Sequence, residues 1–269
     1  MLRLRGYLKP YLFSILLTIA LLFVQANADL ALPDYLSRIV NNGIQQGGVE
    51  NAVPLAIRQS EMDRVLLFAN VDDKALINSS YRLVSPDTLE ASENVEAYPA
   101  LANEAVYVCK ELEQSQIDAL NPVMGKYILV VYTLEQALAD PVKAAAMAES
   151  SGFDLAMLPP GTDLFTLLKS LPPEQLAQMT TGFNEKFATL GESMINQMAV
   201  AAVKAEYTAL GMDASKMQTD YITRTGGMML LISLLGGACM IATGYLAART
   251  AAGAARDIRQ DIFKKVESF

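Results

Sequence analysis

The chain of 269 residues has no histidine, no tryptophan and only two cysteines, Cys109 and Cys239. Histidine is the commonest general base and the commonest zinc ligand, so its absence weakens most hydrolase and metalloenzyme interpretations. Two cysteines cannot form a disulfide framework. Cys239 lies inside an apolar run, where we expect it to act as a small buried residue.

Sequence motifs for nucleotide or covalent chemistry are also missing. The chain contains no G-x-x-x-x-G-K-[ST], G-x-G-x-x-G, C-x-x-C or G-x-S-x-G pattern. The acidic residues do not follow the D-x-D-x-D spacing of a calcium loop, and we expect them to be solvated. We therefore predict no catalytic, cofactor-binding or metal-binding residues in this chain.

Charge is distributed unevenly along the chain. The net charge is −8, yet residues 50–220 hold 24 acidic and 11 basic residues while the remainder holds 5 acidic and 10 basic ones. An acidic middle argues against nucleic acid as a partner.

The first apolar run extends from Tyr11 to Ala28 and follows the basic residues Arg3, Arg5 and Lys9. It is typical of either a membrane helix or a signal peptide, because Ala26-Asn27-Ala28 resembles a cleavage site. Apolar residues continue at helical spacing beyond Ala28, which favours an uncleaved helix. Cleavage would instead leave a secreted domain held by a C-terminal anchor.

The second apolar run extends from Gly226 to Ala248 and contains no charge over 23 residues. As a helix it is ~34 Å long, enough to cross a bilayer. The pattern continues past Arg249, where one face carries the apolar residues Ile258, Ile262, Phe263 and Val266. The spacing predicts one helix that leaves the membrane and continues into water.

The basic residues flanking both runs predict the topology, because positive residues remain on the cytoplasmic side. We expect a cytoplasmic N-terminus (residues 1–10), a first membrane helix (11–46), an extracytoplasmic domain (47–220), a second membrane helix (221–248) and a cytoplasmic helical extension (249–269). The expected fold is mainly α, with two long membrane helices flanking a mostly helical domain in the plasma membrane.

Short sequence signals predict where some helices of the external domain begin and end. Asn42-Gly43 and Gly47-Gly48 are expected to end the first helix, and Asp213 to start a helix that leads into the second span. Ser60 with Asp63 predicts a capped helix start. The segment Tyr127–Tyr132 is rich enough in β-branched and aromatic residues to be a strand, and its sequence does not decide between strand and helix.

Charged residues at the outer end of the first run are the candidate functional site. They are Asp29, Asp34 and Arg38, with Pro33 between them as an expected kink. Asp34 and Arg38 are one turn apart and are expected to pair. The group is either a polar hinge facing a water-filled pathway or an ordinary solvated helix end.

Small residues recur every four positions in the second helix, which lets helix backbones approach closely. One ladder is Gly244, Ala248 and Ala252, and the other is Ala247, Ala251 and Ala255. Two helices cannot cover all these surfaces, so helical partners are expected.

Two blocks of sequence resemble the transmembrane domain of an ABC exporter half-transporter of the Gram-positive type. The first block comprises Leu8–Tyr11, Ala28–Pro33 and Ile39–Ile44, and the second comprises Tyr245–Arg249, Ala254–Arg259 and Ile262–Phe269. They are similar to the family's first and second helices. Some family members carry a large extracytoplasmic domain between these two helices.

The resemblance implies a function for the complete protein that this chain cannot perform alone. A complete half-transporter has four further spans and a nucleotide-binding domain that uses ATP and Mg, pairs with a second half as a homodimer or heterodimer, and exports a substrate whose identity the sequence does not give. This chain is expected to be an N-terminal fragment that supplies two helices and an external cap.

An alternative class is the N-terminal module of a membrane sensor, in which a signalling helix follows the second span. Such proteins usually place a proline soon after that span, and none follows Arg249 here.

Overall fold

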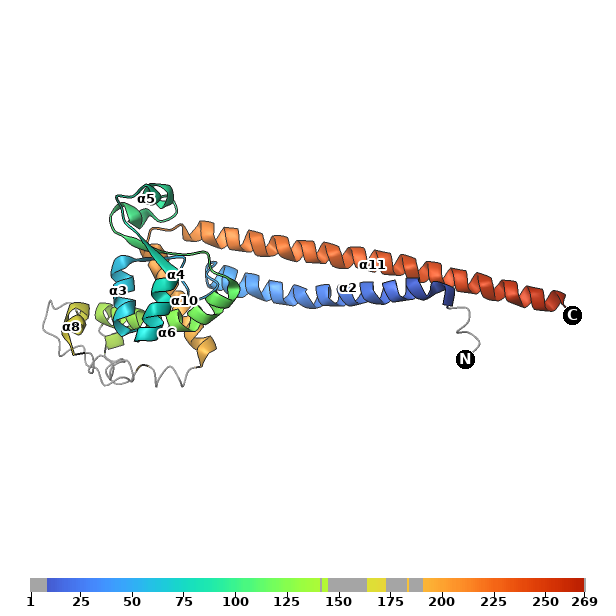
Figure 1. The fold of residues 1–269 in the computed structure, drawn as a ribbon, viewed down its shortest axis with the longest axis horizontal. Helices are drawn as coiled ribbons and strands as arrows, with labels where there is room; N and C mark the ends of the chain where they lie inside the picture. Colours follow the sequence, from blue (N-terminus) through green and yellow to red (C-terminus); the bar gives the residue numbers. More distant parts are fainter. Residues whose placement is uncertain (1–8, 141, 145–163, 173–182, 184–190, 269) are drawn as a thin grey trace. The chain divides into compact units, whose positions relative to one another are not determined.

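The computed structural model describes residues 9–140, 142–144, 164–172, 183 and 191–268. The chain divides into two compact units (Figure 1): a terminal unit formed by Met1–Gln45 and Thr219–Phe269, and a central domain formed by Gln46–Gln218. The structure is mainly helical and contains two helices long and apolar enough to cross a membrane. These features confirm the coarse fold expected from the sequence.

The terminal unit contains a 3-10 turn, η1 (Lys9–Tyr11), the helix α2 (Leu12–Arg38), a π-helical segment, η2 (Ile39–Gln45), and most of α11 (Ala214–Glu267). The Oδ1 atom of Asp213 accepts hydrogen bonds from the N–H groups of Ser215 (2.9 Å) and Lys216 (3.1 Å), as an N-cap residue does. The predicted helix start at Asp213 is therefore confirmed. Helix α11 then continues through Arg249 without a break.

Two segments, Asn42-Gly43 and Gly47-Gly48, were expected to end the first long helix, and only the second of them does so. Gly47 and Gly48 have φ values of 67° and 91°, which favour glycine, and they follow the last helical residue. The prediction that Asn42-Gly43 also ends the helix is wrong, because both residues lie within η2. A Cβ atom at Gly43 would come within 2.8 Å of Ile222 Cγ1, so this glycine permits close helix packing instead.

A small antiparallel sheet in the central domain was not expected. Its strands are β1 (Ala56–Arg58), β2 (Tyr81–Val84) and β3 (Val106–Cys109), in the order β1-β3-β2. Tyr107 of β3 pairs with Ile57 of β1 and with Leu83 of β2. Strands of three or four residues are too short to display the alternation that identifies a strand in a sequence.

The central domain also contains several helices, and some of them begin with a side-chain cap. The helices of the central domain are α3 (Gln59–Phe68), α4 (Val71–Ser80), α5 (Leu89–Asn94), η3 (Pro99–Ala102), α6 (Gln114–Ala139), α8 (Leu164–Ser170) and α10 (Glu192–Ala209). Glu113 and Gln116 form a capping box at the start of α6. The predicted cap at Ser60 is wrong, because α3 begins one residue earlier and the Ser60 hydroxyl donates to Glu104 (3.3 Å).

The ambiguous segment Tyr127–Tyr132 is helical and lies within α6. Its first five residues are all buried, so neither a helical nor a strand period is visible in the sequence. The hydrophobic core of the central domain joins this part of α6 to residues of α10, α3 and the sheet, including Val203, Met62 and Ile57. The core thereby fixes the faces of α3, α6 and α10 that carry charge.

Candidate functional sites

Two features of the structure are candidates for function: the seam between α2 and α11 in the terminal unit, and a charged cavity in the central domain. Neither involves a metal centre: among the residues that the structure describes, no group of three or more His, Cys, Asp or Glu residues is arranged to hold an ion.

Many small or polar residues lie in the seam, whereas packed helices of a soluble protein usually place apolar residues between them and polar residues outside. The positions that run along the seam alternate at spacings of three and four residues, as in a coiled coil. On α2 and its flanking turns they are Tyr11, Ser14, Thr18, Leu21, Gln25, Ala28, Leu32, Tyr35, Ile39 and Asn42. On α11 they are Ile222, Thr225, Met229, Ile232, Gly236, Cys239, Thr243, Leu246, Thr250, Gly253 and Asp257. Further positions are covered as well, among them Ile15 and Ala31 on α2 and Tyr221, Ala254 and Ile258 on α11. Many of these residues are small or polar.

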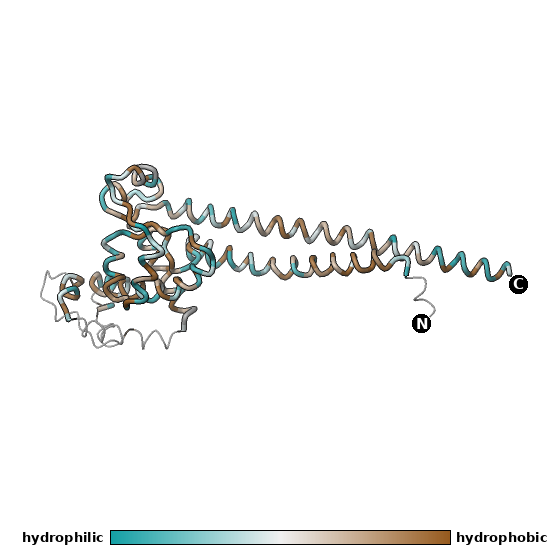
Figure 2. Tube along the Cα trace, in the orientation of Figure 1, coloured by the Kyte–Doolittle hydropathy of each residue, from teal (hydrophilic) through white to brown (hydrophobic). Residues whose placement is uncertain are grey.

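Many large apolar residues on the same helices are exposed. Figure 2 shows that hydrophobic residues lie along both helices and that hydrophilic residues lie at the end of α11. Phe13, Phe23 and Leu30 on α2 are 78%, 72% and 77% exposed, and Ile241 on α11 is 76% exposed. In the most apolar 18-residue stretch of each long helix, only 6% and 11% of the residues are buried. A core helix of a soluble protein would be mostly buried, so these apolar faces need a covering that the described residues of the chain do not supply.

Three contacts fix the antiparallel register of the seam. The Tyr11 hydroxyl donates to Asp257 Oδ2 (2.8 Å) at one end, and Asn42 Nδ2 donates to the Tyr221 hydroxyl (3.4 Å) at the other. Between them, a Cβ atom at Gly236 would lie 3.6 Å from Ala28 Cβ and 3.6 Å from Asp29 Oδ1. Asp29 is therefore level with Gly236.

This register changes the apparent depth of Asp29. In the first apolar run Asp29 lies just past the outer end, whereas Gly236 lies near the middle of the charge-free stretch of α11, twelve residues after Arg224 and thirteen before Arg249. Asp29 is exposed, and no residue in the described part of the chain forms a hydrogen bond or ion pair with its carboxylate. The carboxylate is thus level with the most apolar part of its neighbour and has no partner within the chain.

The other members of the predicted site are arranged differently. Arg38 Nη2 lies 3.0 Å from Asp34 Oδ2, which confirms the predicted pair, and the two side chains are 57% and 59% exposed. Pro33 lies inside α2, which continues to Arg38 and becomes π-helical at Ile39. The structure brings Asp34 and Arg38 together and leaves Asp29 apart from them.

The two ladders of small residues have different environments. Ala247 and Ala251 line an apolar groove against α2, together with Thr250, Ala254, Ile15, Thr18 and Ile19. Gly244, Ala248, Ala252 and Ala255 are exposed, and a Cβ atom at Gly244 would meet no atom within 4 Å. One ladder is therefore partly used within the terminal unit, and the other remains open.

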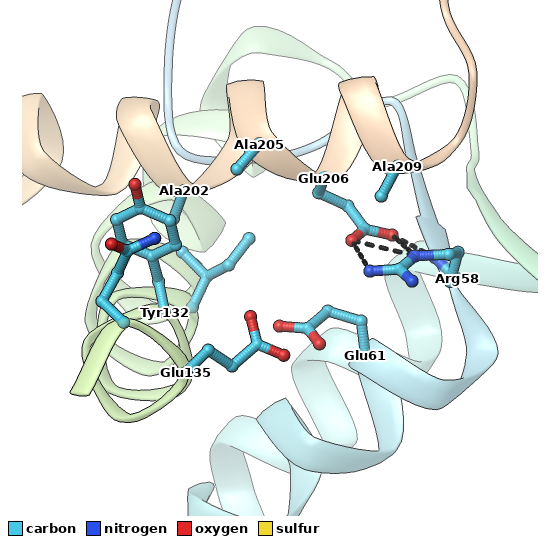
Figure 3. Close-up of a pocket in the computed structure, with 10 residues that line it drawn as sticks. Arg58, Glu61, Tyr132, Glu135, Ala202, Ala205, Glu206 and Ala209 are labelled. Carbon is cyan, nitrogen blue, oxygen red and sulfur yellow. Dashed lines mark hydrogen bonds and ion pairs between the residues drawn. The ribbon is translucent and has the colours of Figure 1, made fainter. Parts of the chain in front are cut away.

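The second candidate is a cavity of about 180 Å³ in the central domain, lined by parts of β1, α3, α6 and α10. Three glutamates line it: Glu61 of α3, Glu135 of α6 and Glu206 of α10. Ala202, Ala205 and Ala209 form its α10 wall, and these short side chains leave the space open (Figure 3). In this view the carboxylates of Glu61 and Glu135 face each other, while Glu206 is paired with Arg58.

Glu206 joins α10 to the edge strand β1. Its carboxylate, 4% exposed, accepts hydrogen bonds from Arg58 Nη2 (2.7 Å) and Nε (3.0 Å) and from the backbone N–H of Arg58 (2.7 Å). The hydrogen bond to Glu206 raises the pKa of Arg58. Because charge-assisted bidentate pairs are the strongest hydrogen bonds in proteins, this contact locks β1 against α10.

Glu61 has a less favourable environment. Its side chain is 6% exposed, and its ion-pair partner is Arg64 (3.2 Å), whose Nη1 atom also bonds Glu135 Oε1. Burial raises the pKa of Glu61 to about 7, and the negative charges of Glu135 and Glu206 add to this effect, while Arg64 and Arg58 oppose it. One arginine is therefore shared by two carboxylates, one of which is nearly enclosed.

Sequence analysis did not find this cavity. Glu61 and Arg64 are three residues apart on one helix, which is a detectable signal, but Glu135 and Glu206 are 74 and 145 positions away from Glu61. Only the packing of α3, α6 and α10 brings them together.

Comparison of the chain with protein-family models, with curated proteins and with solved structures gave no match.

Proposed function

We propose that the chain is a membrane protein with two spans, α2 and α11, and that it forms the N-terminal part of the transmembrane domain of an ATP-driven ABC exporter. The single observation that carries the membrane assignment is the distribution of side chains around the seam: small and polar residues are frequent between the helices, while many large apolar residues lie on the outward faces. In lipid, helices associate through small and polar residues because the lipid is as apolar as their large side chains.

The orientation is part of the proposal. Arg3, Arg5 and Lys9 precede the first span, and Arg249 begins a series of basic residues after the second. The positive-inside rule favours both ends in the cytoplasm and the central domain outside the cell.

In this function, the two spans help to line the transport pathway and the central domain acts as an external cap. Asp29 supports a pathway role because the register places it beside Gly236, ~18 Å from Arg224 and ~20 Å from Arg249 at 1.5 Å per residue. A hydrocarbon core of ~30 Å centred on this stretch would enclose Asp29. An unpaired carboxylate at that depth requires water, a cation or a partner helix.

The proposed partners follow from the open surfaces. The ladder of Gly244, Ala248 and Ala252 is available to the remaining spans of the same transporter or to a second half-transporter. ATP and Mg would bind in the nucleotide-binding domain of the complete protein, so this chain alone would not hydrolyse ATP.

A membrane sensor is the second candidate, and one observation favours it. Helix α11 runs for 54 residues from Ala214 to Glu267, so a rotation or shift at one end would be transmitted to the other. Signalling helices of sensors use such continuity.

The coding sequence downstream of codon 269 distinguishes the two. A continuing frame with four more hydrophobic spans and a G-x-x-x-x-G-K-[ST] motif is expected for the exporter. A kinase or methyl-accepting domain there would reject the exporter in favour of the sensor.

A further inference from the structure

The cavity in Figure 3 contains Glu61, a carboxyl group that is almost completely enclosed. The ionisable groups around the Glu61 carboxyl are Arg64 on its own helix, Arg58 of β1, Glu135 and Tyr132 of α6, and Glu206 of α10. Glu104, from the segment before β3, contacts this group only through Arg58 at 4.0 Å. With all three glutamates ionised, these five charged groups of the cavity carry one net negative charge.

The two arginines are not equally available to neutralise it. Arg58 is committed to Glu206 by bonds of 2.7 to 3.2 Å, including one from its backbone N–H. Arg64 must therefore serve both Glu61 and Glu135, and its guanidinium also stacks on Phe165, 4.4 Å from the ring centre. The uncompensated charge falls on the pair Glu61 and Glu135.

We propose that Glu61 and Glu135 form a proton-binding pair that controls the packing of α3 against α6 in the central domain. When Glu61 takes a proton from water, its O–H donates to the facing carboxylate of Glu135, and Arg64 pairs with Glu135. When Glu61 releases the proton, the two carboxylates repel each other and water enters the cavity between α3, α6 and α10.

The ion pair between Arg58 and Glu206, here called the clamp, does not change in this step, because both of its charges are already paired. The motion is therefore confined to the α3–α6 side of the cavity, while β1 stays fixed to α10. The small alanines of α10 leave room for the water that enters. The proton site needs only the central domain, so it does not depend on the exporter assignment.

The raised pKa of Glu61 gives the expected size of the effect. The closed arrangement binds the proton with a pKa of about 7, whereas a solvated Glu61 in the open arrangement has the ordinary value of 4.5. Between these two values the ratio of closed to open arrangement changes about tenfold per pH unit.

The test is amide hydrogen exchange of α3 in the complete chain, held in lipid nanodiscs and corrected for intrinsic exchange rates. We expect the protection factors of α3 amides in the wild type to fall about tenfold per pH unit as the pH rises toward 7, for those amides that exchange through opening of α3. Glu61→Gln, a neutral isostere, is expected to show the protection of the low-pH wild type at every pH. Glu135→Gln removes the facing negative charge and is expected to move the transition to lower pH.

Asp72→Asn is the matched control, because Asp72 is exposed on the neighbouring helix α4. It is expected to behave as the wild type. If the wild type shows no pH dependence in α3, if the dependence survives in Glu61→Gln, or if it is lost equally in Asp72→Asn, the proposal is wrong. Should Glu61→Gln not fold, an isotope-edited infrared titration of the Glu61 carboxyl in the wild type decides: ionisation complete below pH ~5.5, near an ordinary value, contradicts it.

Discussion

Replacing Glu206 by alanine tests how the central domain is held together. The substitution removes a carboxylate that is 4% exposed and accepts hydrogen bonds from both the side chain and the backbone N–H of Arg58. Arg58, whose side chain is 26% exposed, would keep only Glu104 at 4.0 Å. The end of β1 would lose its ion pair with α10, while the hydrogen bond from the Leu55 N–H to the Tyr207 hydroxyl (2.8 Å) would remain.

The expected cost follows from the two groups left without partners. Breaking a buried ion pair by removing one member costs about 3–5 kcal/mol, and this range includes the orphaned charge. An unsatisfied backbone N–H costs about 1–3 kcal/mol, although solvent reaching the partly exposed Arg58 offsets some of the loss. We expect Glu206→Ala to lower the free energy of unfolding by about 3 kcal/mol.

Pulse proteolysis of the full chain in urea and detergent measures this change. The matched control is Glu111→Ala, which removes an exposed glutamate and is expected to change stability by less than about 0.5 kcal/mol. In the double variant Arg58→Met with Glu206→Leu, no charge is left unpaired, so its loss should be smaller than the sum of the single losses. The proposed role of the Arg58–Glu206 pair is wrong if Glu206→Ala lowers the free energy of unfolding by less than about 1 kcal/mol. It is also wrong if the loss in the double variant equals the sum of the losses in its two single variants.

Three further predictions concern other parts of the chain. Folding raises the pKa of Glu61 from 4.5 to about 7, so the folded state binds this proton more tightly than the unfolded state does. The free energy of unfolding should therefore fall by up to about 3 kcal/mol as the pH rises from 4.5 to 7, and a urea midpoint that does not change with pH would contradict this prediction. Gly253→Leu should displace the Tyr11 side chain and break its hydrogen bond to Asp257, which costs about 0.5–1.5 kcal/mol by thermal proteolysis, whereas Gly244→Leu, at an open position, should not; equal losses would reject the register. Asp29→Asn removes an unpaired charge from the proposed span, so it should alter vesicle transport by the complete protein without lowering its stability, and unaltered transport rejects a pathway role.

The sequence carries most information where a pattern repeats. The long charge-free run before Arg249 and the apolar spacing beyond it predict α11, and Asp213 marks its start. Asp34 and Arg38, one turn apart, predict their own ion pair. These features depend on residues close in sequence, so helical geometry alone relates them.

Features that depend on distant segments could not be predicted in this way. The three short strands lack a visible period, and Tyr127–Val131 are all buried, which hides the helical period of this segment. The depth of Asp29 relative to Gly236 requires the register between two helices separated by the whole central domain. Likewise, the cavity around Glu61 exists only after three helices pack.

The central claim is that α2 and α11 cross the membrane and that the central domain lies outside the cell. Single-cysteine variants, made after Cys109 and Cys239 are replaced by serine, test this claim through labelling of intact cells with a membrane-impermeant maleimide. Glu111→Cys is exposed in the central domain, and Lys264→Cys is exposed near the end of α11. We predict that Glu111→Cys is labelled on intact cells and Lys264→Cys only after permeabilisation; labelling of Lys264→Cys on intact cells, or protection of Glu111→Cys until lysis, would contradict the account.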